Sequence, residues 1–363
     1  MSIIYEIFFT LLKSAIWNTT PLLPRKLSDK EWEDVFSISV EQTTTGIILD
    51  AIGRLPEEQR PGKGLRLKWI LHLKAIERQN AHMNGVLAEL LEGLEEKHIE
   101  SFLLKGQGIA QCYPVPMHRT CGDIDLYFQP GHFENAIAHF TMLGCKITDK
   151  PDDPHAVTEY KGIKIELHRE NATFYTRSLQ KRYDNITADI IAKEDEATVN
   201  IGNKKVHTLP PVANALQLLS HMQRHIIFSG LGMRQICDWI LFAKEYHQFL
   251  DNDSFLDNLE KLQLANTYKA ISVIATDILW LPHSYLLCKT TRKDKRNAKK
   301  VLDLVLRYGN FGQYGEHCIH KTKSDYLKAY IWKVRNCIRF GSLAGSEAWS
   351  YPLWQLHTIK KML

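Results

Sequence analysis

Apolar residues recur at helical spacing through most of residues 1–98, which predicts that this segment is α-helical. Ser28 followed by Glu31 fits a capping box, in which two side chains satisfy the first backbone N–H groups of a helix. A loop rich in proline and glycine follows at 56–64. One long amphipathic helix is then expected, and its apolar stripe consists of Ile70, Leu73, Ile76, Met83, Leu87, Leu90 and Leu94.

The pattern changes near residue 99, where short apolar runs alternate with turns. The runs 99–104 and 124–128 predict two buried strands, and 132–143 predicts a helix between later strands. The segments 159–168 and 197–209 alternate between apolar and polar residues around a central glycine, which is typical of two β-hairpins. This order of elements indicates a small α/β or α+β domain over residues 99–209.

From Pro210-Pro211 onward the chain is predicted to be helical to its end, because a proline commonly opens a helix. Residues 233–246 give the clearest apolar stripe of this part. We therefore expect a helical region at 1–98, a sheet domain at 99–209 and a helical domain at 210–363.

Composition places the chain among ordinary globular proteins. It has 363 residues, of which 44% are hydrophobic and 24% are charged, and these values exclude a largely disordered or collagen-like chain. No run of about 18 uninterrupted apolar residues is present, so we expect no stable membrane insertion. Residues 1–17 come closest, but Glu6 and Lys13 interrupt them; an amphipathic helix closing a core is expected, with attachment to a membrane surface as the alternative.

Charge and cysteine content bear on nucleic-acid binding, zinc binding and cellular compartment. The net charge of +5 equals that of the segment 291–300, TRKDKRNAKK, so the remainder is close to neutral. Such a run is usually a solvated face, and RNA binding is the alternative. The seven cysteines form no C-x-x-C pair and no cluster of zinc ligands, and no secretion signal is recognisable. Reduced thiols in a cytoplasmic protein are expected.

Two carboxylates in the second predicted strand are the first candidate for chemistry. In Gly122-Asp123-Ile124-Asp125-Leu126, Asp123 and Asp125 project from one face because side chains alternate along a strand. Stacked carboxylates repel unless cations lie between them, and Mg²⁺ takes carboxylate oxygens together with substrate phosphates. A third carboxylate is expected on a neighbouring strand, and Glu166 in Ile165-Glu166-Leu167 is the natural candidate. The alternative is that all three lie on a solvent-facing sheet surface.

A glycine-containing turn is the second candidate. Lys105-Gly106-Gln107 follows the first predicted strand, where exposed backbone N–H groups could receive phosphate oxygens. The turn is not a P-loop, and a purely structural role is the alternative. Arg119 could bind a phosphate with two hydrogen bonds, or could be an ordinary surface residue.

A third group of polar residues lies in the C-terminal part. His221, Arg224 and His225 are spaced to share a helix face, and Arg224 or His225 could contact a triphosphate or an acceptor. Arg234 and Asp238 could simply form a pair four residues apart. His168 lies on the strand face of Glu166, either supporting that carboxylate or exposed to solvent.

These motifs resemble the nucleotidyltransferase superfamily that includes DNA polymerase beta, and more narrowly a bacterial family of uncharacterised nucleotidyltransferases. The matching segments are LLKGQGIAQCYPVPMHRTCGDIDLYF at 103–128, IKIELH at 163–168 and HMQRHIIFSGLGMRQICDWILF at 221–242. The resemblance implies an α+β fold with a small mixed-sheet domain between helical regions. It also implies metal-dependent transfer of a nucleotidyl group from a nucleoside triphosphate such as ATP to an acceptor.

The resemblance assigns roles to particular residues. Asp123, Asp125 and Glu166 would be the catalytic carboxylates and would bind Mg²⁺, as two ions, with Mn²⁺ as an alternative. Glu166 would also help to deprotonate the acceptor. The usual turn of the superfamily is Gly-Ser or Gly-Gly, and this chain departs from it because the serine hydroxyl is missing. The expected nucleotide-binding residues are Lys105, Gly106, Gln107, Arg119, Gly122, Arg224 and His225.

Two functions from different classes follow. The first is a nucleotidyltransferase whose acceptor is a small molecule, a protein side chain or an RNA end. The second is a catalytically inactive protein of the same fold that binds a nucleotide or a partner protein. A phosphotransferase of the kinase type is disfavoured, because the sequence has no H-x-D catalytic loop and no D-F-G element.

Overall fold

The computed structural model describes residues 2–150, 153–193, 197–314, 323–350 and 352–353. Its contacts divide the chain into two compact units. The division into domains at 1–98, 99–209 and 210–363 stays a prediction. The first unit comprises Met1–Phe36, Thr45–Thr173 and Ile190–Asn214, and the second comprises Ser37–Thr44, Phe174–Asp189 and Ala215–Leu363.

The first unit contains one mixed sheet of six strands. Its strand order is β3-β4-β2-β1-β6-β5, with parallel pairs β2/β4 and β1/β6 and antiparallel pairs elsewhere. Both predicted hairpins are present, as β3/β4 and β5/β6, and the α+β class is confirmed. The strands are β1 Phe102–Leu104, β2 Ile124–Tyr127, β3 His155–Tyr160, β4 Ile163–His168, β5 Ala197–Ile201 and β6 Lys204–Thr208.

The first strand is shorter than the predicted 99–104. His98 has a φ of 54°, and the N–H of Ile99 donates to the carbonyl of Leu94, so this segment ends the preceding helix. Ile99 is nevertheless buried in the core. The apolar run therefore marked a buried segment of which only the second half is strand.

Helices and short helical turns supply the rest of this unit. Ser28 and Glu31 form the predicted capping box, since the N–H of Ser28 donates to Glu31 and the N–H of Glu31 to Ser28 Oγ. The elements are α1 Ile3–Trp17, α2 Asp29–Glu41, α3 Thr45–Gly53, η1 Glu57–Gln59, α4 Lys63–Glu96, α5 Gly106–Ala110, η2 Pro116–His118 and α6 Phe133–Met142.

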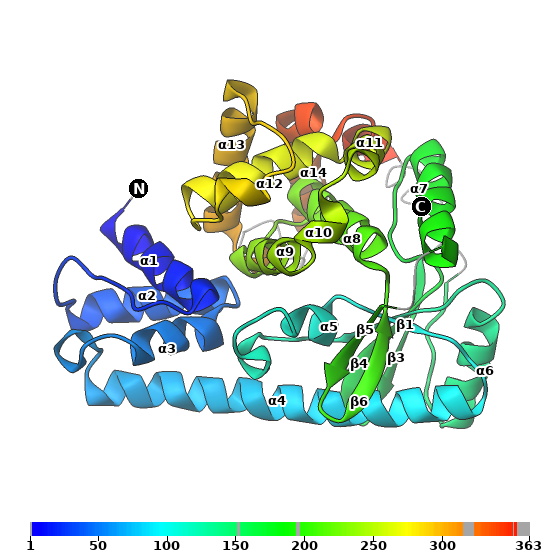
Figure 1. Ribbon diagram of the computed structural model, residues 1–363, viewed down its shortest axis with the longest axis horizontal. Coiled ribbons are helices and arrows are strands. Elements are labelled where there is room, and N and C mark those ends of the chain that lie inside the picture. The colour runs from blue at the N-terminus through cyan, green and yellow to red at the C-terminus, as the bar shows by residue number, and fades with distance from the viewer. Residues whose placement is uncertain (1, 151–152, 194–196, 315–322, 351, 354–363) are drawn as a thin grey trace. The chain divides into compact units, whose positions relative to one another are not determined.

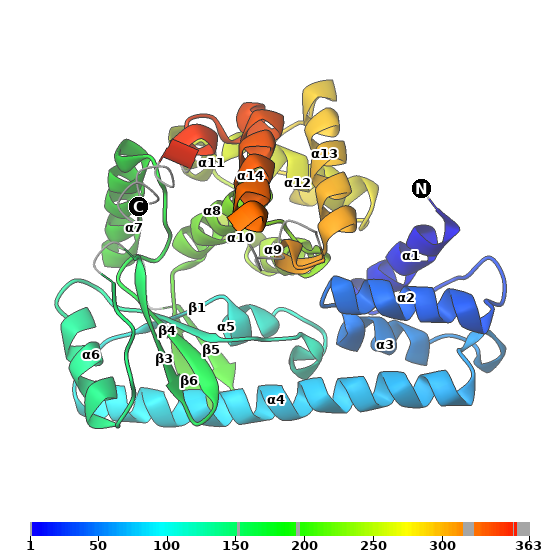
Figure 2. The ribbon, with the colours of Figure 1, turned by 180° about the vertical axis from the view of Figure 1, so that it is seen from behind.

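Helix α4, the long helix of Figures 1 and 2, supports the sheet. Its 34 residues span about 50 Å at about 1.5 Å per residue. The predicted stripe is buried from Ile76 to Leu94, but Ile70 is 45% exposed, so the prediction was wrong there. Trp69 takes the buried position instead and packs edge-on against Phe36 of α2.

The two faces of the sheet carry different surroundings. Ile124 and Leu126 of β2, with Ile165 and Leu167 of β4, are fully buried in a core shared with α4 and α6. On the opposite face Tyr127 packs in a smaller apolar cluster with Leu104, Leu209 and Ala213. Because side chains alternate, the polar residues of β2 and β4 share this second face.

The loop that leads into β2 is fastened to the helices behind it. The buried amide of Asn80 on α4 donates to the carbonyls of Met117 and Arg119, each at 2.8 Å. A methyl group on Gly46 of α3 would lie 2.3 Å from the carbonyl oxygen of His118, so helix and loop are in direct backbone contact. These contacts fix where the chain enters the β2 strand.

The second unit is helical. As predicted, the described residues after Pro210 contain helices and no strand. Among them, no helix is long and apolar enough to cross a membrane. Its helices are α7 Arg177–Lys193 and α8 Pro211–Phe228, each shared with the first unit, and α9 Met233–Glu245, α10 His247–Leu250, α11 Asp253–Lys261, α12 Ala265–Asp277, η3 His283–Tyr285, α13 Arg292–Tyr308, η4 Asn310–Gly312 and α14 Lys323–Ala344.

The contacts of His118 predict a pH-dependent stability. Its ring lies 2.8 Å from Asp50 and 3.2 Å from Glu77, and although burial lowers its pKa, these carboxylates raise the pKa above 6.5 overall. A raised pKa stabilises the fold fully below the unfolded value and less as pH rises through the folded value. We expect His118→Gln to cost about 1–2 kcal/mol near about pH 5.5 and much less near about pH 9. Denaturant unfolding at both pH values measures this, and an equal cost at both would contradict it.

Candidate active site

The three predicted carboxylates lie on the same face of the sheet. Asp123 directly precedes β2, Asp125 lies within it and Glu166 lies within β4. The parallel register of β2 and β4 places Asp125 opposite Glu166. Neighbouring residues at one register position lie roughly 5 Å apart, so the two carboxylates are held close together.

His168 bridges two of these carboxylates. Its Nε2 lies 2.9 Å from Oδ1 of Asp125 and 3.3 Å from Oε2 of Glu166. Asp125 is only 4% exposed and His168 only 8%, so water cannot replace this contact easily. The sequence left open whether His168 supports the site or is exposed, and the structure shows a buried partner of both carboxylates.

Two lysines complete the charge balance. Lys105 Nζ lies 3.3 Å from Asp125 Oδ1, and Lys164 Nζ lies 3.6 Å from Asp123 Oδ2 while also contacting Glu166 Oε1. Three acidic groups are thereby surrounded by two lysines and a histidine. The cluster is consequently near neutrality without any bound ion.

The two aspartates differ in their electrostatic surroundings. Burial, with repulsion from Asp125 and Glu166, raises the pKa of Asp123. Burial also acts to raise the pKa of Asp125, but Lys105 and His168 outweigh it and lower that pKa overall. The negative charge of Asp125 is therefore stabilised by the fold, whereas that of Asp123 is not.

Glu166 and His168 shift in opposite directions. Burial opposes ionisation of Glu166, yet hydrogen bonds from His168 and Lys164 lower its pKa far below the usual range. Burial likewise disfavours a charged His168, but Asp125 and Glu166 raise its pKa overall. Glu166 is therefore held in its ionised form, in which its oxygens can accept hydrogen bonds or ligate a cation.

The turn between β1 and α5 has an unusual backbone. Lys105 has a φ of 49° and a ψ of −136°, and Gly106 has a φ of 40°. A residue with a side chain in such a conformation costs about 1–3 kcal/mol and persists where the surroundings enforce it, often at functional sites. A glycine would adopt it without strain.

The turn also contains an unsatisfied amide. Gln107 is 2% exposed, and neither polar atom of its side chain has a hydrogen-bond partner in the part of the chain that the structure describes. A buried amide left unpaired costs about 1–3 kcal/mol. Because protein encloses both atoms, the turn would have to rearrange before a ligand could pair with them.

The other predicted nucleotide-binding residues differ in their setting. Arg119 is buried, and its Nη1 donates to the carbonyl of Thr120 and to Sγ of Cys121. Gly122 is exposed, with open space around its Cα. Arg224 and His225 lie on α8 in the second unit, where His225 contacts His221 at 3.0 Å. Their role in nucleotide binding stays a prediction.

Sequence reasoning missed two members of the cluster, His155 and Lys164. His155 Nε2 lies 3.7 Å from Glu166 Oε2, although eleven positions separate the two residues in the chain. Antiparallel pairing of β3 with β4 places His155 opposite His168. Because side chains alternate along β4, the sequence could have placed Lys164 on the same face as Glu166. The position of His155 could be known only from the register between β3 and β4.

The donor set fits a divalent cation. Asp123, Asp125 and Glu166 offer carboxylate oxygens from two adjacent strands, which is what Mg²⁺ requires from protein. Lys105 and Lys164 already neutralise these carboxylate oxygens. A metal ion that binds here would therefore have to displace their ammonium groups. These oxygens are of the kind that Mg²⁺ takes, whereas a group whose ligand atoms all lie within 4.8 Å of one another is formed by His155, Glu166 and His168.

The fold and this cluster can now be compared with known proteins. A family model described as "Uncharacterised nucleotidyltransferase" matches residues 28–279, which is more than half of the chain. The chain belongs to this family of uncharacterised nucleotidyltransferases. The match covers the carboxylates, the turn, and helices α8 and α9.

Comparison with solved structures gives a weaker likeness. A nucleotidyltransferase-like antigenic protein from Paracoccidioides brasiliensis shares 16% identity, with a TM-score of 0.38. The similarity covers 56% of this chain and 95% of that one. No curated protein matches the chain.

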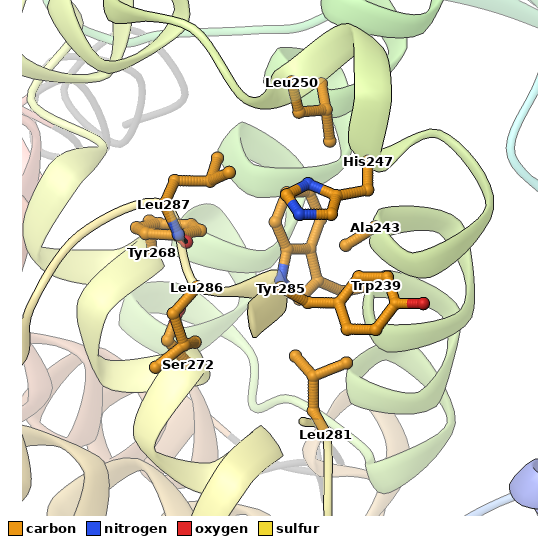
Figure 3. A pocket seen from close by; sticks show the side chains of 10 residues that line it. All are labelled: Trp239, Ala243, His247, Leu250, Tyr268, Ser272, Leu281, Tyr285, Leu286 and Leu287. Atoms are coloured by element: carbon orange, nitrogen blue, oxygen red, sulfur yellow. Dashed lines mark hydrogen bonds between the residues drawn. The ribbon is translucent and has the colours of Figure 1, made fainter. Parts of the chain in front are cut away.

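A separate pocket lies within the second unit (Figure 3). Its lining is aromatic and aliphatic, with the rings of His247 and Tyr285 5.0 Å apart, and includes no carboxylate, lysine or arginine. It therefore offers packing surface and no charge for a triphosphate. The lining residues are Trp239, Ala243, His247, Leu250, Tyr268, Ser272, Leu281, Tyr285, Leu286 and Leu287.

The unequal surroundings of the aspartates predict unequal effects on stability. Sequence alone suggested that neutralising either aspartate would relieve repulsion. With the contacts known, Asp125→Asn removes a buried charge from Lys105 and His168 and should cost about 3 kcal/mol. Asp123→Asn should be neutral or stabilise by less than about 1 kcal/mol, because Asp123 is half-exposed and its charge is disfavoured. Urea unfolding of the metal-free variants measures both, and equal effects would contradict this account.

Proposed function

We propose that the protein is a metal-dependent nucleotidyltransferase that moves a nucleoside monophosphate from a nucleoside triphosphate to an acceptor hydroxyl. The observation that carries the proposal is the register of β2 and β4, which brings Asp125 and Glu166 together on the face that also presents Asp123. Membership of the nucleotidyltransferase family supports it.

The carboxylates would hold the cation. Asp123, Asp125 and Glu166 supply its oxygen ligands, and a bound Mg²⁺ or Mn²⁺ contributes positive charge for the phosphate oxygens and orients the attacking oxygen. Lys105 and Lys164 would then be released from the carboxylates. Their ammonium groups become available for the α-, β- and γ-phosphates, so that the charge balance of the cluster is kept.

The turn would position the triphosphate. Lys105 and Gly106 present backbone at positive φ, and the unpaired amide of Gln107 offers both a donor and an acceptor. Gly122 leaves room next to Asp123, and Arg119 holds the loop that carries both.

The acceptor supplies the nucleophile. Its hydroxyl oxygen forms a bond to the α-phosphorus while the bond to pyrophosphate breaks, and its proton must be taken up by a base. Glu166, which the fold keeps ionised, is the proposed base of the cluster. The acceptor is a small molecule, a protein side chain or an RNA end, and the cytoplasm is the predicted location.

A second function has a specific observation in its favour. Lys105 and Lys164 already occupy the carboxylates and neutralise them without an ion. A catalytically inactive protein that binds nucleotide through the turn would use this arrangement unchanged. Its nucleotide binding would not depend on magnesium.

Titration with ATP, GTP, CTP and UTP, with and without Mg²⁺, tests the proposal. Asp123→Asn is the informative variant because it should fold as well as the parent chain. We expect Mg²⁺-dependent binding of at least one triphosphate, and this binding should be at least about tenfold weaker in the variant. Loss of a residue that only supports a metal ligand typically weakens metal binding by about tenfold or more, and loss of the ligand itself should weaken it at least as much. Asp34→Asn, which removes a half-exposed acid on α2, is the matched control and should bind normally.

Transfer itself is measured with triphosphate labelled at the α-phosphate. Label should move to the acceptor fraction only with metal and only in proteins that retain Asp123. Binding that is independent of Mg²⁺, without transfer, would support the inactive function. If none of the four triphosphates binds, the protein is neither a nucleotidyltransferase nor an inactive nucleotide-binding protein.

A further inference from the structure

We propose that His155, Glu166 and His168 form a nitrogen–oxygen site for a first-row divalent cation of the Zn²⁺ and Co²⁺ class. One ligand atom from each residue lies within 4.8 Å of the other two. The site shares Glu166 with the proposed active site, but ion binding at it does not depend on nucleotidyl transfer.

Strand pairing builds this site. His155 lies opposite His168 in the β3/β4 register, and Glu166 is two residues from His168 on the same face. Glu166 Oε2 lies 3.7 Å from His155 Nε2 and 3.3 Å from His168 Nε2. Ligands about 2.0–2.1 Å from a tetrahedral ion lie roughly 3.3 Å from one another, so small side-chain rotations suffice.

The donor atoms favour a different ion from the one expected between Asp123 and Asp125. Imidazole nitrogen suits Zn²⁺ and other first-row transition ions, whereas Mg²⁺ prefers oxygen alone. Two histidines and one carboxylate leave further positions open for water, substrate or another side chain. Mg²⁺ should therefore be a poor competitor at this site.

The existing contacts of Glu166 leave the required oxygen available. Lys164 contacts Oε1, while both histidines face Oε2. An ion bound to Oε2 therefore need not displace Lys164. His155 is on the edge strand with its side chain 23% exposed, which gives an ion a route from solvent.

Binding would change the role of His168. Its Nε2 now contacts Asp125 Oδ1, and coordination through Nε2 requires the proton on that nitrogen to leave to solvent. Asp125 Oδ1 would then lie beside the ion as a candidate fourth ligand. Asp123 contacts neither histidine in any described interaction, so it stands outside this site.

Titration with Co²⁺ tests the site, because its visible absorption reports the coordinating atoms. We expect about one Co²⁺ per chain, without the near-ultraviolet absorption of a cysteine thiolate bound to cobalt. Zn²⁺ should displace it, and excess Mg²⁺ should not. His155→Ala should weaken binding at least about tenfold, because loss of a direct ligand exceeds the usual effect of losing a supporting group.

Control variants make the result specific. His82→Ala removes an exposed histidine of α4 that contacts only a backbone carbonyl in its described hydrogen bond, and should bind Co²⁺ normally. His168→Gln should also weaken binding, but His155→Ala decides the test because His155 is an edge residue whose loss should leave the fold intact. Circular dichroism verifies folding.

The outcomes separate this inference from the proposed function. Asp123→Asn should lose Mg²⁺-dependent nucleotide binding and keep Co²⁺ binding. Retention of the His155-dependent cobalt signal in a protein that binds no nucleotide would support the site by itself. Absence of cobalt binding, a thiolate spectrum, or equal affinity in folded His155→Ala would overturn it.

Discussion

The repulsion between Asp125 and Glu166 is the constraint around which this site is arranged. Parallel pairing of β2 and β4 places the two carboxylates at one register position on a largely buried face. They cannot move apart without breaking the strand pairing, so positive groups must come to them. His168 enters between them, and Lys105 and Lys164 cover their outer sides.

This arrangement explains why the site is stable without an ion and yet suited to one. The two lysines have long side chains that can turn away, whereas His168 is buried and Asp125 and Glu166 lie on strands anchored in the core with α4 and α6. In the proposed function the lysines would move onto phosphate while a metal takes their place. The strained backbone of Lys105 keeps one of these charges at the turn between β1 and α5.

Much of the fold followed from local sequence pattern. The hairpin glycines, the capping box at Ser28 and the alternation around Asp125 each determine structure within a few residues, and each prediction is confirmed. The predicted burial of Ile70 was wrong, because periodicity identifies an apolar stripe but not which of its residues another element covers. Trp69 takes the buried position and packs against Phe36.

The site was predictable only in part, for the same reason. Asp123, Asp125 and Glu166 share a motif, and alternation puts the aspartates on one side. His155 joins the cluster through pairing between β3 and β4, a relation that residue spacing does not encode. Lys105 was expected at the turn, but its contact with Asp125 depends on a backbone conformation that a lysine rarely adopts, so that contact required the structure.

The most direct measurement is a crystal structure of the protein with Mn²⁺ and a nucleoside triphosphate whose α–β bridge resists cleavage. We expect metal density bounded by Asp123, Asp125 and Glu166, with the triphosphate against the Lys105 turn and the lysine side chains moved onto phosphate. A nucleotide bound elsewhere, or carboxylates still paired with both lysines and no metal, would contradict it.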